Sequence, residues 1–126
     1  MVTLQHFEVE DFIPIKQLRD DFSELAKNGA VIVSGSQAHF PQGFDFINNS
    51  FIHYGLGNLF FDQMDNWLRK STIDVHYFYN GKYVNNEIYP IINEDYGQPR
   101  FMTNEESNQF MRKMFENSFY FLNDNS

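Results

Sequence analysis

The chain has 126 residues, 42% hydrophobic and 18% aromatic, and this length and apolar content predict one globular domain covering residues 1–126. The net charge of −8 and the scattered Lys and Arg disfavour binding to nucleic acid or to a membrane surface. No Cys is present, which excludes disulfides, thiolate metal ligands and thiol catalysis, and the lack of a signal peptide or long apolar run predicts a cytoplasmic protein.

The first part of the chain predicts a helix between two strands. Apolar residues at helical spacing indicate a helix over 13–28, which ends at Asn28-Gly29. Short runs over 4–9 and 30–33 indicate strands on either side, the second because it is brief and β-branched. These elements form a βαβ-like unit whose strand directions the sequence leaves open.

The middle of the chain mixes turn residues with aromatic residues. Two short strands, 44–47 and 51–54, are predicted around the Asn-Asn-Ser turn at 48–50. A helix is predicted over 59–70 because its apolar residues fall on one face, and Asn58 is its expected cap.

The strongest local pattern is the alternation of apolar residues on both sides of Asn80-Gly81. This dipeptide suits a two-residue type I′ turn and predicts a β-hairpin whose register follows from the turn. In that register Asp74 lies opposite Glu87. The face toward the core is then predicted to carry five apolar side chains: Ile73, Val75, Tyr77, Val84 and Ile88.

The last predicted helix covers 104–122, because Thr103 and Glu106 have the spacing of a capping box. Its apolar residues cover about half of the circumference, which is more than one sheet face needs. The excess predicts either a deep groove inside the same domain, which leaves a monomer, or an apolar contact with a second copy of the chain or with another protein, and the contact is the favoured outcome. The residues expected in this contact are Met111, Phe115, Phe119 and Leu122.

These elements predict an α+β fold with a small mixed or antiparallel sheet of about four to six strands and about three helices. A partly closed barrel is the alternative arrangement of the same strands.

The outer face of the hairpin is the first candidate site. The predicted register places Asp74, His76, Asn85 and Glu87 there, with the two carboxylates directly opposed, an arrangement that normally destabilises a sheet. A bound cation, a shared proton or a basic partner would compensate this repulsion, and His76 is close enough to take part. The alternative is that Glu87 swings away and that the face is only solvated.

The second candidate site is the turn that contains Gly55, Gly57 and Asn58. Backbone N–H groups and the dipole of the following helix would hold an anion there. The turn lacks the third small residue of a dinucleotide fingerprint and the Gly-Lys-Ser/Thr of a P-loop. The alternative is therefore a flexible turn closed by an Asn cap.

No motif in the sequence identifies a reaction or a ligand. The four His have none of the spacings of zinc sites, so neither a metal nor a cofactor is expected. The acidic surface and the apolar last helix favour a non-enzymatic accessory protein that binds another protein, such as a regulator, an inhibitor or an immunity protein. Fourteen Asn, nine Ile and only three Ala suggest AT-rich codons, which favour a bacterial, plasmid or phage source.

Two other functions remain open at this point. An RNA- or nucleotide-binding regulatory domain would use Tyr and Phe side chains to stack bases, although the acidic charge argues against it. A small enzyme would use the Asp, His and Glu side chains of the hairpin face.

Overall fold

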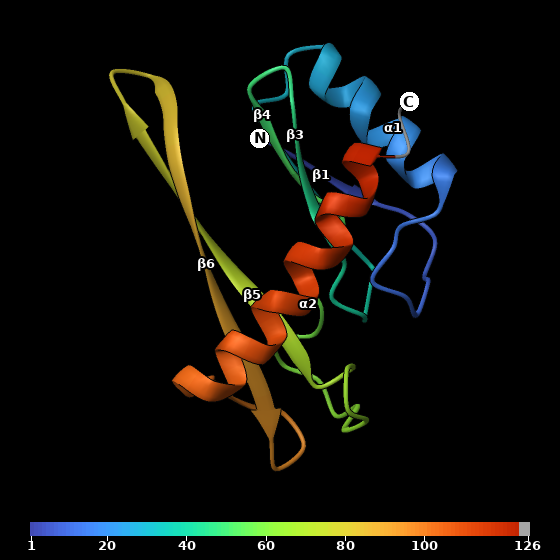
Figure 1. The fold of residues 1–126 in the computed structure, drawn as a ribbon, viewed down its shortest axis with the longest axis vertical. Coiled ribbons are helices and arrows are strands. Elements are labelled where there is room, and N and C mark those ends of the chain that lie inside the picture. The colour runs from blue at the N-terminus through green and yellow to red at the C-terminus, as the bar shows by residue number, and fades with distance from the viewer. Residues whose placement is uncertain (124–126) are drawn as a thin grey trace.

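A computed structural model of the chain describes residues 1–123, with side chains described up to residue 118. Two helices and two separate sheets, of four and three strands, make up the fold (Figure 1). The predicted α+β class is therefore confirmed. The described residues form two helices instead of three, and their strands form two open sheets instead of a single sheet or a closed barrel.

The first sheet is built around a βαβ unit. Its elements are β1 (Val2–Gln5), α1 (Lys16–Lys27), β2 (Ile32–Ser36), β3 (Phe44–Ile47) and β4 (Ser50–His53). The strand order is β1-β2-β4-β3, in which β1, β2 and β4 are parallel and β3 is antiparallel to β4. The predicted order of strand, helix and strand is confirmed, but the bounds differ: both strands, predicted at 4–9 and 30–33, are shifted, and the helix begins three residues later than predicted.

Apolar side chains at helical spacing hold α1 against one face of this sheet. The helix ends as predicted, because Asn28 is its C-cap residue and Gly29 follows with a φ of 96°, a conformation that favours glycine. The core between helix and sheet consists of six buried side chains: Leu18, Phe22, Ala26, Val33, Ile52 and Tyr54.

The turn between β3 and β4 follows the prediction for the Asn-Asn pair. Asn48 and Asn49 have φ values of 51° and 65°, both in the left-handed region that a type I′ turn requires. Asn tolerates this conformation better than most residues, so the turn sets the register of the two strands.

The second sheet contains the predicted hairpin. Its strands are β5 (Lys70–Tyr79), β6 (Lys82–Glu94) and β7 (Gln98–Phe101), all antiparallel. Asn80 and Gly81 have φ values of 48° and 73°, which confirms the predicted type I′ turn. The end of the hairpin that carries this turn projects away from the rest of the molecule (Figure 1).

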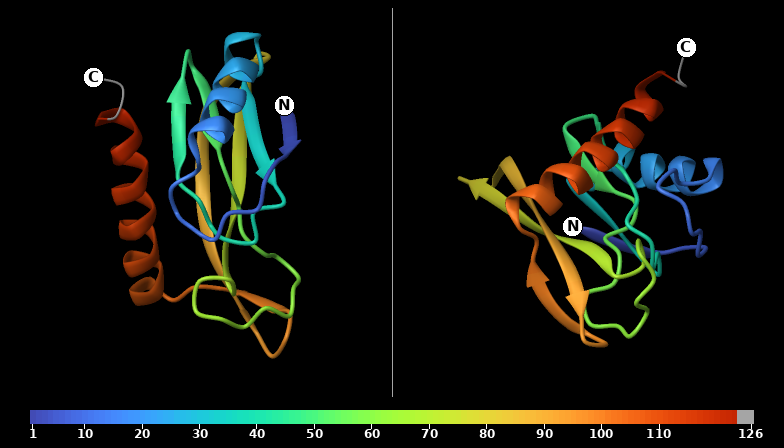
Figure 2. Two further views of the ribbon diagram at one scale, coloured as in Figure 1. Left: turned by 90° about the vertical axis from the view of Figure 1, so that its right-hand side faces the viewer. Right: turned by 60° about the horizontal axis from the view of Figure 1, so that its bottom comes forward.

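The last helix, α2 (Asn104–Asn123), begins with the predicted capping box. The backbone N–H of Thr103 donates to the Glu106 carboxylate at 2.8 Å, and the backbone N–H of Glu106 donates to the Thr103 hydroxyl at 3.4 Å. The helix contacts β3 of the first sheet and β6 of the second, and it lies along one side of the molecule (Figure 2). The core beneath it contains five buried side chains: Phe12, Phe44, Phe51, Phe110 and Met114.

Successive side chains of β4 point to opposite faces of the first sheet, and one of these faces packs against the second sheet. Ile52 points to α1, whereas Phe51 and His53 point to the opposite side, toward β5. The first sheet is therefore covered by α1 on one face and by the second sheet with α2 on the other. None of the helices in the described part of the chain has the length and apolar character that crossing a membrane requires.

The predicted helix over 59–70 is wrong: residues 59–69 form a loop, and Lys70 begins β5. Asn58, predicted as the helix cap, is 6% exposed and donates from Nδ2 to the backbone oxygen of Leu68 at 2.9 Å. The backbone oxygen of Asn58 accepts from the side chain of Asn93 at 2.9 Å, so both the side chain and the backbone of Asn58 are bonded to residues beyond the predicted first turn. Tertiary hydrogen bonds to one polar residue thus override the helical pattern.

Candidate functional site

Three parallel strands end at the same edge of the first sheet. The segments that follow β1, β2 and β4 are residues 6–8, 37–39 and 54–58, and they come together beyond the carboxyl ends of these strands. In open sheets with parallel strands this edge is the usual place for a ligand. A cavity of about 310 Å³, lined by Gln5, His6 and Phe7, opens at the end of β1.

Asn58 fixes the orientation of a His side chain at this edge. Its Nδ2 donates to Leu68 O at 2.9 Å and to Gln63 Oε1 at 3.0 Å, which uses both amide hydrogens. The Oδ1 atom then points to His39, 2.6 Å from Nδ1. Because an amide oxygen only accepts, His39 Nδ1 carries the hydrogen, and Nε2 holds the free lone pair of the neutral imidazole.

The other ring nitrogen of His39 faces a carboxylate, and the His39 side chain is partly exposed. Nε2 lies 4.0 Å from Glu8 Oε1, and the side chains of His39 and Glu8 are 24% and 44% exposed. The ring of Phe61 lies beside the imidazole, with 4.8 Å between ring centres. An imidazole whose tautomer is fixed at one nitrogen and whose ring is partly exposed is suited to exchange a proton with a ligand.

Close backbone approach accounts for the glycines of the predicted anion turn. A Cβ on Gly55 would lie 2.6 Å from the Cβ of Ala38, and a Cβ on Gly57 would lie 2.6 Å from the backbone oxygen of Lys70. The helix whose dipole supported an anion site after Asn58 is absent. Gly55 and Asn58 bring the loops after β2 and β4 together, and Asn58 positions His39, whereas Gly57 lies against the start of β5.

The predicted pairing of Asp74 with Glu87 is wrong. A β-bulge between Tyr77 and Phe78 shifts the register by one residue, so Asp74 pairs with Ile88, and Glu87 pairs with Val75. Neighbouring positions on a strand point to opposite faces, and the two carboxylates therefore lie on different faces of the sheet. No group of three or more His, Asp or Glu side chains suited to a metal ion is found among the described residues.

The face of the hairpin that was predicted to be solvent-exposed is turned toward the first sheet. Asp74 Oδ2 accepts from His53 Nδ1 at 2.6 Å, and these side chains are 6% and 1% exposed. His76 lies 5.6 Å from the ring of Phe51 between ring centres, and burial lowers the pKa of His76. The predicted core face is in turn the more exposed one, with Tyr77 and Val84 42% and 58% exposed.

Glu87 and Asn85 lie apart from this buried pair. Both are exposed, and the carboxylate of Glu87 accepts from the hydroxyls of Tyr77 at 2.9 Å and Tyr89 at 2.5 Å. These hydrogen bonds, that from Tyr89 first, lower the pKa of Glu87. The four polar residues predicted as one face, Asp74, His76, Asn85 and Glu87, therefore do not form one site.

The predicted contact surface on α2 is described only in part. Phe115 is 46% exposed and meets the ring of Phe44 at 5.2 Å between centres, and Met111 is half-buried at the same core. The side chains of Phe119 and Leu122 lie outside the described residues. Contact with another protein or with a second copy of the chain stays a prediction.

His39 and Glu8 were not among the predicted site residues, because the four His have none of the spacings of zinc motifs. A positional signal was present: His39 follows the short buried strand β2, and Glu8 follows the short strand β1. Had the strands been taken as parallel, both residues would have been placed at the ligand edge of one sheet.

Comparison with known protein families gives a match to part of the chain. The family model described as bacterial capsule synthesis protein PGA_cap matches residues 2–63, which is just under half of the chain. The matched segment contains the whole first sheet together with Glu8, His39 and Asn58. No curated protein matches the chain.

This match corrects the functional prediction from the sequence. It points to capsule synthesis and not to a small regulator, inhibitor or immunity protein, and it gives no support to a plasmid or phage source. The acidic surface that suggested a basic partner carries no such information, because a net negative charge also serves solubility. The predicted cytoplasmic location stays a prediction.

Proposed function

We propose that this protein takes part in bacterial capsule synthesis and that the edge of the first sheet around His39 is the site through which it acts. The observation that carries this proposal is the overlap between the family match at residues 2–63 and the segments that build the site. All three parallel strands, and the loops after them, lie within the matched segment.

In this proposal His39 acts through Nε2, which takes a proton from a ligand or gives one to it. Asn58 keeps the tautomer fixed through Nδ1, and the Glu8 carboxylate lies 4.0 Å from Nε2. Glu8 and Asn58 are thus positioning residues. Their effect on the site comes through His39.

The test is capsule formation in the bacterium that encodes the chain. We expect His39→Gln to abolish or strongly reduce the amount of capsular polymer, because Gln keeps a donor for Asn58 but cannot exchange a proton. The matched control is His76→Gln, which changes a half-buried His in the second sheet, outside the matched segment. Urea unfolding of both variants checks that each remains folded.

Two results would contradict the proposal. Normal capsule after deletion of the gene would refute a part in capsule synthesis. Loss of capsule on deletion, together with normal capsule in a folded His39→Gln strain, would keep the function and reject the site.

A further inference from the structure

A second cavity lies outside the segment that matches the family. It has a volume of about 560 Å³, which falls in the range of small-molecule sites, and it opens between the loop before β5, the end of β6 and the first turns of α2. Its polar and aromatic lining includes Asn66, Trp67, Arg69, Lys70, Glu106 and Gln109. A space this large is many times the volume of a single water molecule or simple ion.

Two neighbouring cations line this cavity. Lys70 Nζ lies 3.9 Å above the centre of the Trp67 ring and donates to Asn66 Oδ1 at 2.9 Å. Arg69 donates from Nε to the backbone oxygen of Asn93 at 2.9 Å. Within the described residues neither cation has a carboxylate within ion-pair distance, and burial, followed by the charge of Arg69, lowers the pKa of Lys70.

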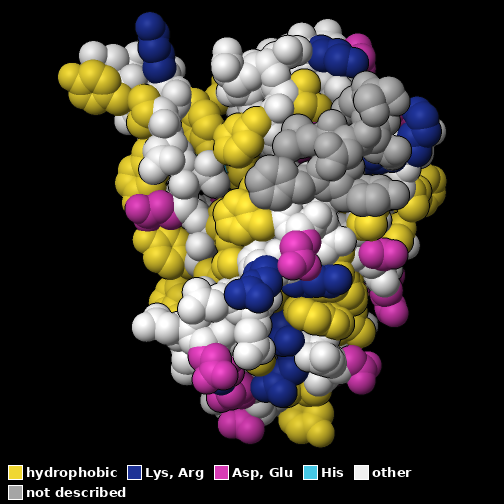
Figure 3. Space-filling view, viewed as in Figure 1, with side chains coloured by type: hydrophobic (Ala, Val, Ile, Leu, Met, Phe, Trp, Pro, Cys, Tyr) yellow, Lys and Arg dark blue, Asp and Glu magenta, His cyan; other side chains and the backbone are white. Residues whose placement is uncertain are grey.

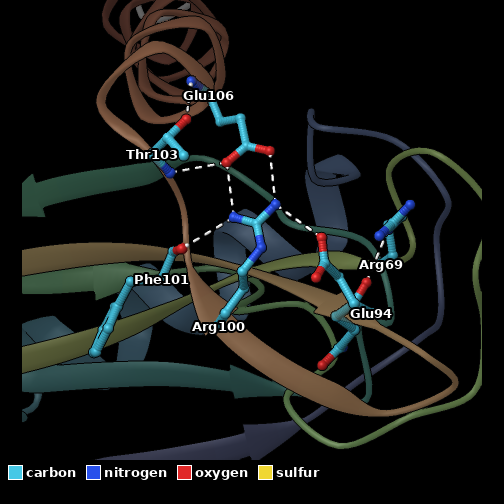
Figure 4. A network of polar contacts seen from close by, with 7 residues as sticks. Arg69, Glu94, Arg100, Phe101, Thr103 and Glu106 are labelled. Carbon is cyan, nitrogen blue, oxygen red and sulfur yellow. Dashed lines mark hydrogen bonds and ion pairs between the residues drawn. The ribbon is translucent and has the colours of Figure 1, made fainter.

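The carboxylates near the cavity are already engaged by another Arg. Arg100 contacts Glu106 through two hydrogen bonds of 2.8 and 2.9 Å and contacts Glu94 at 2.8 Å (Figure 4). The three cations Arg69, Lys70 and Arg100 exceed the two carboxylates by one, so this group of five residues has a net charge of +1 in a chain whose net charge is −8. Lys and Arg side chains also gather over the lower half of α2 and below it in the space-filling view (Figure 3).

The remaining walls suit the rest of an organic molecule. Asn66 and Gln109 present amide groups that donate and accept hydrogen bonds. The apolar wall is formed by Met64, Trp67, Ile92, Met102 and Phe110. Apolar walls with a few convergent polar groups are typical of ligand sites.

We infer that this cavity binds a small hydroxylated organic anion of about the size of one sugar unit, with its carboxylate or phosphate group between Arg69 and Lys70. The amides of Asn66 and Gln109 contact its hydroxyls, and the carbon skeleton lies on the apolar wall. The inference does not depend on the proposed function, because the lining residues begin at Met64, after the matched segment ends.

Trp67 makes the inference directly testable, since it is the only Trp in the sequence and Lys70 lies on its ring. The intrinsic fluorescence of the full chain is titrated with glucuronate, glucose 6-phosphate, glucose and inorganic phosphate. We expect a saturable change with glucuronate or with glucose 6-phosphate, and the two arms distinguish a carboxylate from a phosphate ligand. We expect at least tenfold weaker binding of glucose and of inorganic phosphate.

Charge removal tests the role of the cations. Arg69→Gln and Lys70→Gln should each weaken the binding at least tenfold, whereas Arg112→Gln, which removes an exposed cation from α2, should leave it unchanged. If urea melts show that either pocket variant does not fold, the test is the salt dependence of ligand binding by the wild type. Two cations that bind an anion should bind it clearly more weakly at high salt than at low salt.

Three outcomes would overturn the inference. The first is the absence of a saturable change with both organic anions. The second is equal binding of glucose, or binding that salt and both pocket variants leave unchanged. The third is binding of inorganic phosphate as tight as that of glucose 6-phosphate, which would leave a simple ion site.

Discussion

Glu106 connects the start of α2 to β7 through Arg100, and this contact gives a residue-level prediction about pH. The hydrogen bonds from Arg100, and after them the backbone N–H of Thr103, lower the pKa of Glu106 from 4.5 to about 2. Because the pKa of Glu106 is lower in the folded state, the ionised carboxylate stabilises the protein at any pH above the unfolded-state pKa of 4.5. This contribution is lost as the pH falls from 4.5 toward 2.

Glu106→Gln should therefore lower the urea midpoint at pH 7, and its difference from the wild type should shrink as the pH falls through that window. Glu105→Gln is the control, because it removes the same charge from the first turn of α2 without touching Arg100. A difference that stays constant down to pH 2 would show that the ion pair does not carry the effect.

Gly35 gives a second prediction at this scale. A Cβ at this position would overlap the backbone oxygen of Tyr54, and neither strand can shift without disturbing the sheet. Gly35→Ala should reduce the free energy of unfolding by at least ~2 kcal/mol. Gly29→Ala, where the φ is 96° but the space is open, should cost only about 1 kcal/mol. Urea melts that give the reverse order would contradict this reading of the sheet.

At the scale of elements, the β-bulge in the hairpin changes the expected effect of Glu87→Gln. The opposed register predicted that this substitution would stabilise the chain by removing repulsion from Asp74. In the observed register Glu87 accepts hydrogen bonds from Tyr77 and Tyr89, which a neutral amide accepts less strongly. The urea midpoint of Glu87→Gln should stay unchanged or fall. A clear rise would show instead that Glu87 lies opposite Asp74, as the sequence pattern predicted.

Patterns confined to a few neighbouring residues predicted much of the fold. The Asn80-Gly81 turn, the capping box at Thr103 and the end of α1 at Asn28 each depend on local backbone chemistry, and all three are confirmed. The bulge left no such sign, because Asn85-Asn86 interrupts the alternation that would have revealed an extra residue.

The missed features depend on residues that are distant in the sequence. The loop at 59–69 is held by Asn93, whose side chain donates to the backbone oxygen of Asn58, 35 residues away. The site at His39 needs the ends of three separate strands, and only their parallel direction brings Glu8 to the same edge. A single sequence carries no direct record of such pairings, so the candidate site could be located only after the topology was known.

For the whole molecule, the buried pair His53–Asp74 joins the two sheets. His53 Nε2 and Asp74 Oδ1 are buried without a hydrogen-bond partner in the described part of the chain. The bond of 2.6 Å between His53 Nδ1 and Asp74 Oδ2 is therefore the polar interaction through which this pair stabilises the contact between the two sheets. A double-mutant cycle with His53→Ala and Asp74→Ala should give a coupling of about 1–3 kcal/mol. Additive single effects would mean that the pair does not hold the sheets together.

The hairpin β5-β6 contacts the rest of the molecule from Ser71 as far as His76 and Tyr83, whereas its turn is free, and this has a consequence for amide hydrogen exchange. Ser71 and Thr72, at the attached end, are buried, whereas Phe78 and Tyr79, beside the free turn, are 55% and 71% exposed. The hairpin can therefore open from its turn inward while the two sheets stay in contact. Exchange should slow steadily along β5 from Tyr79 toward Ser71, and only the amides nearest Ser71 should require global unfolding. A single uniform rate along β5 would show instead that the strand opens as one unit.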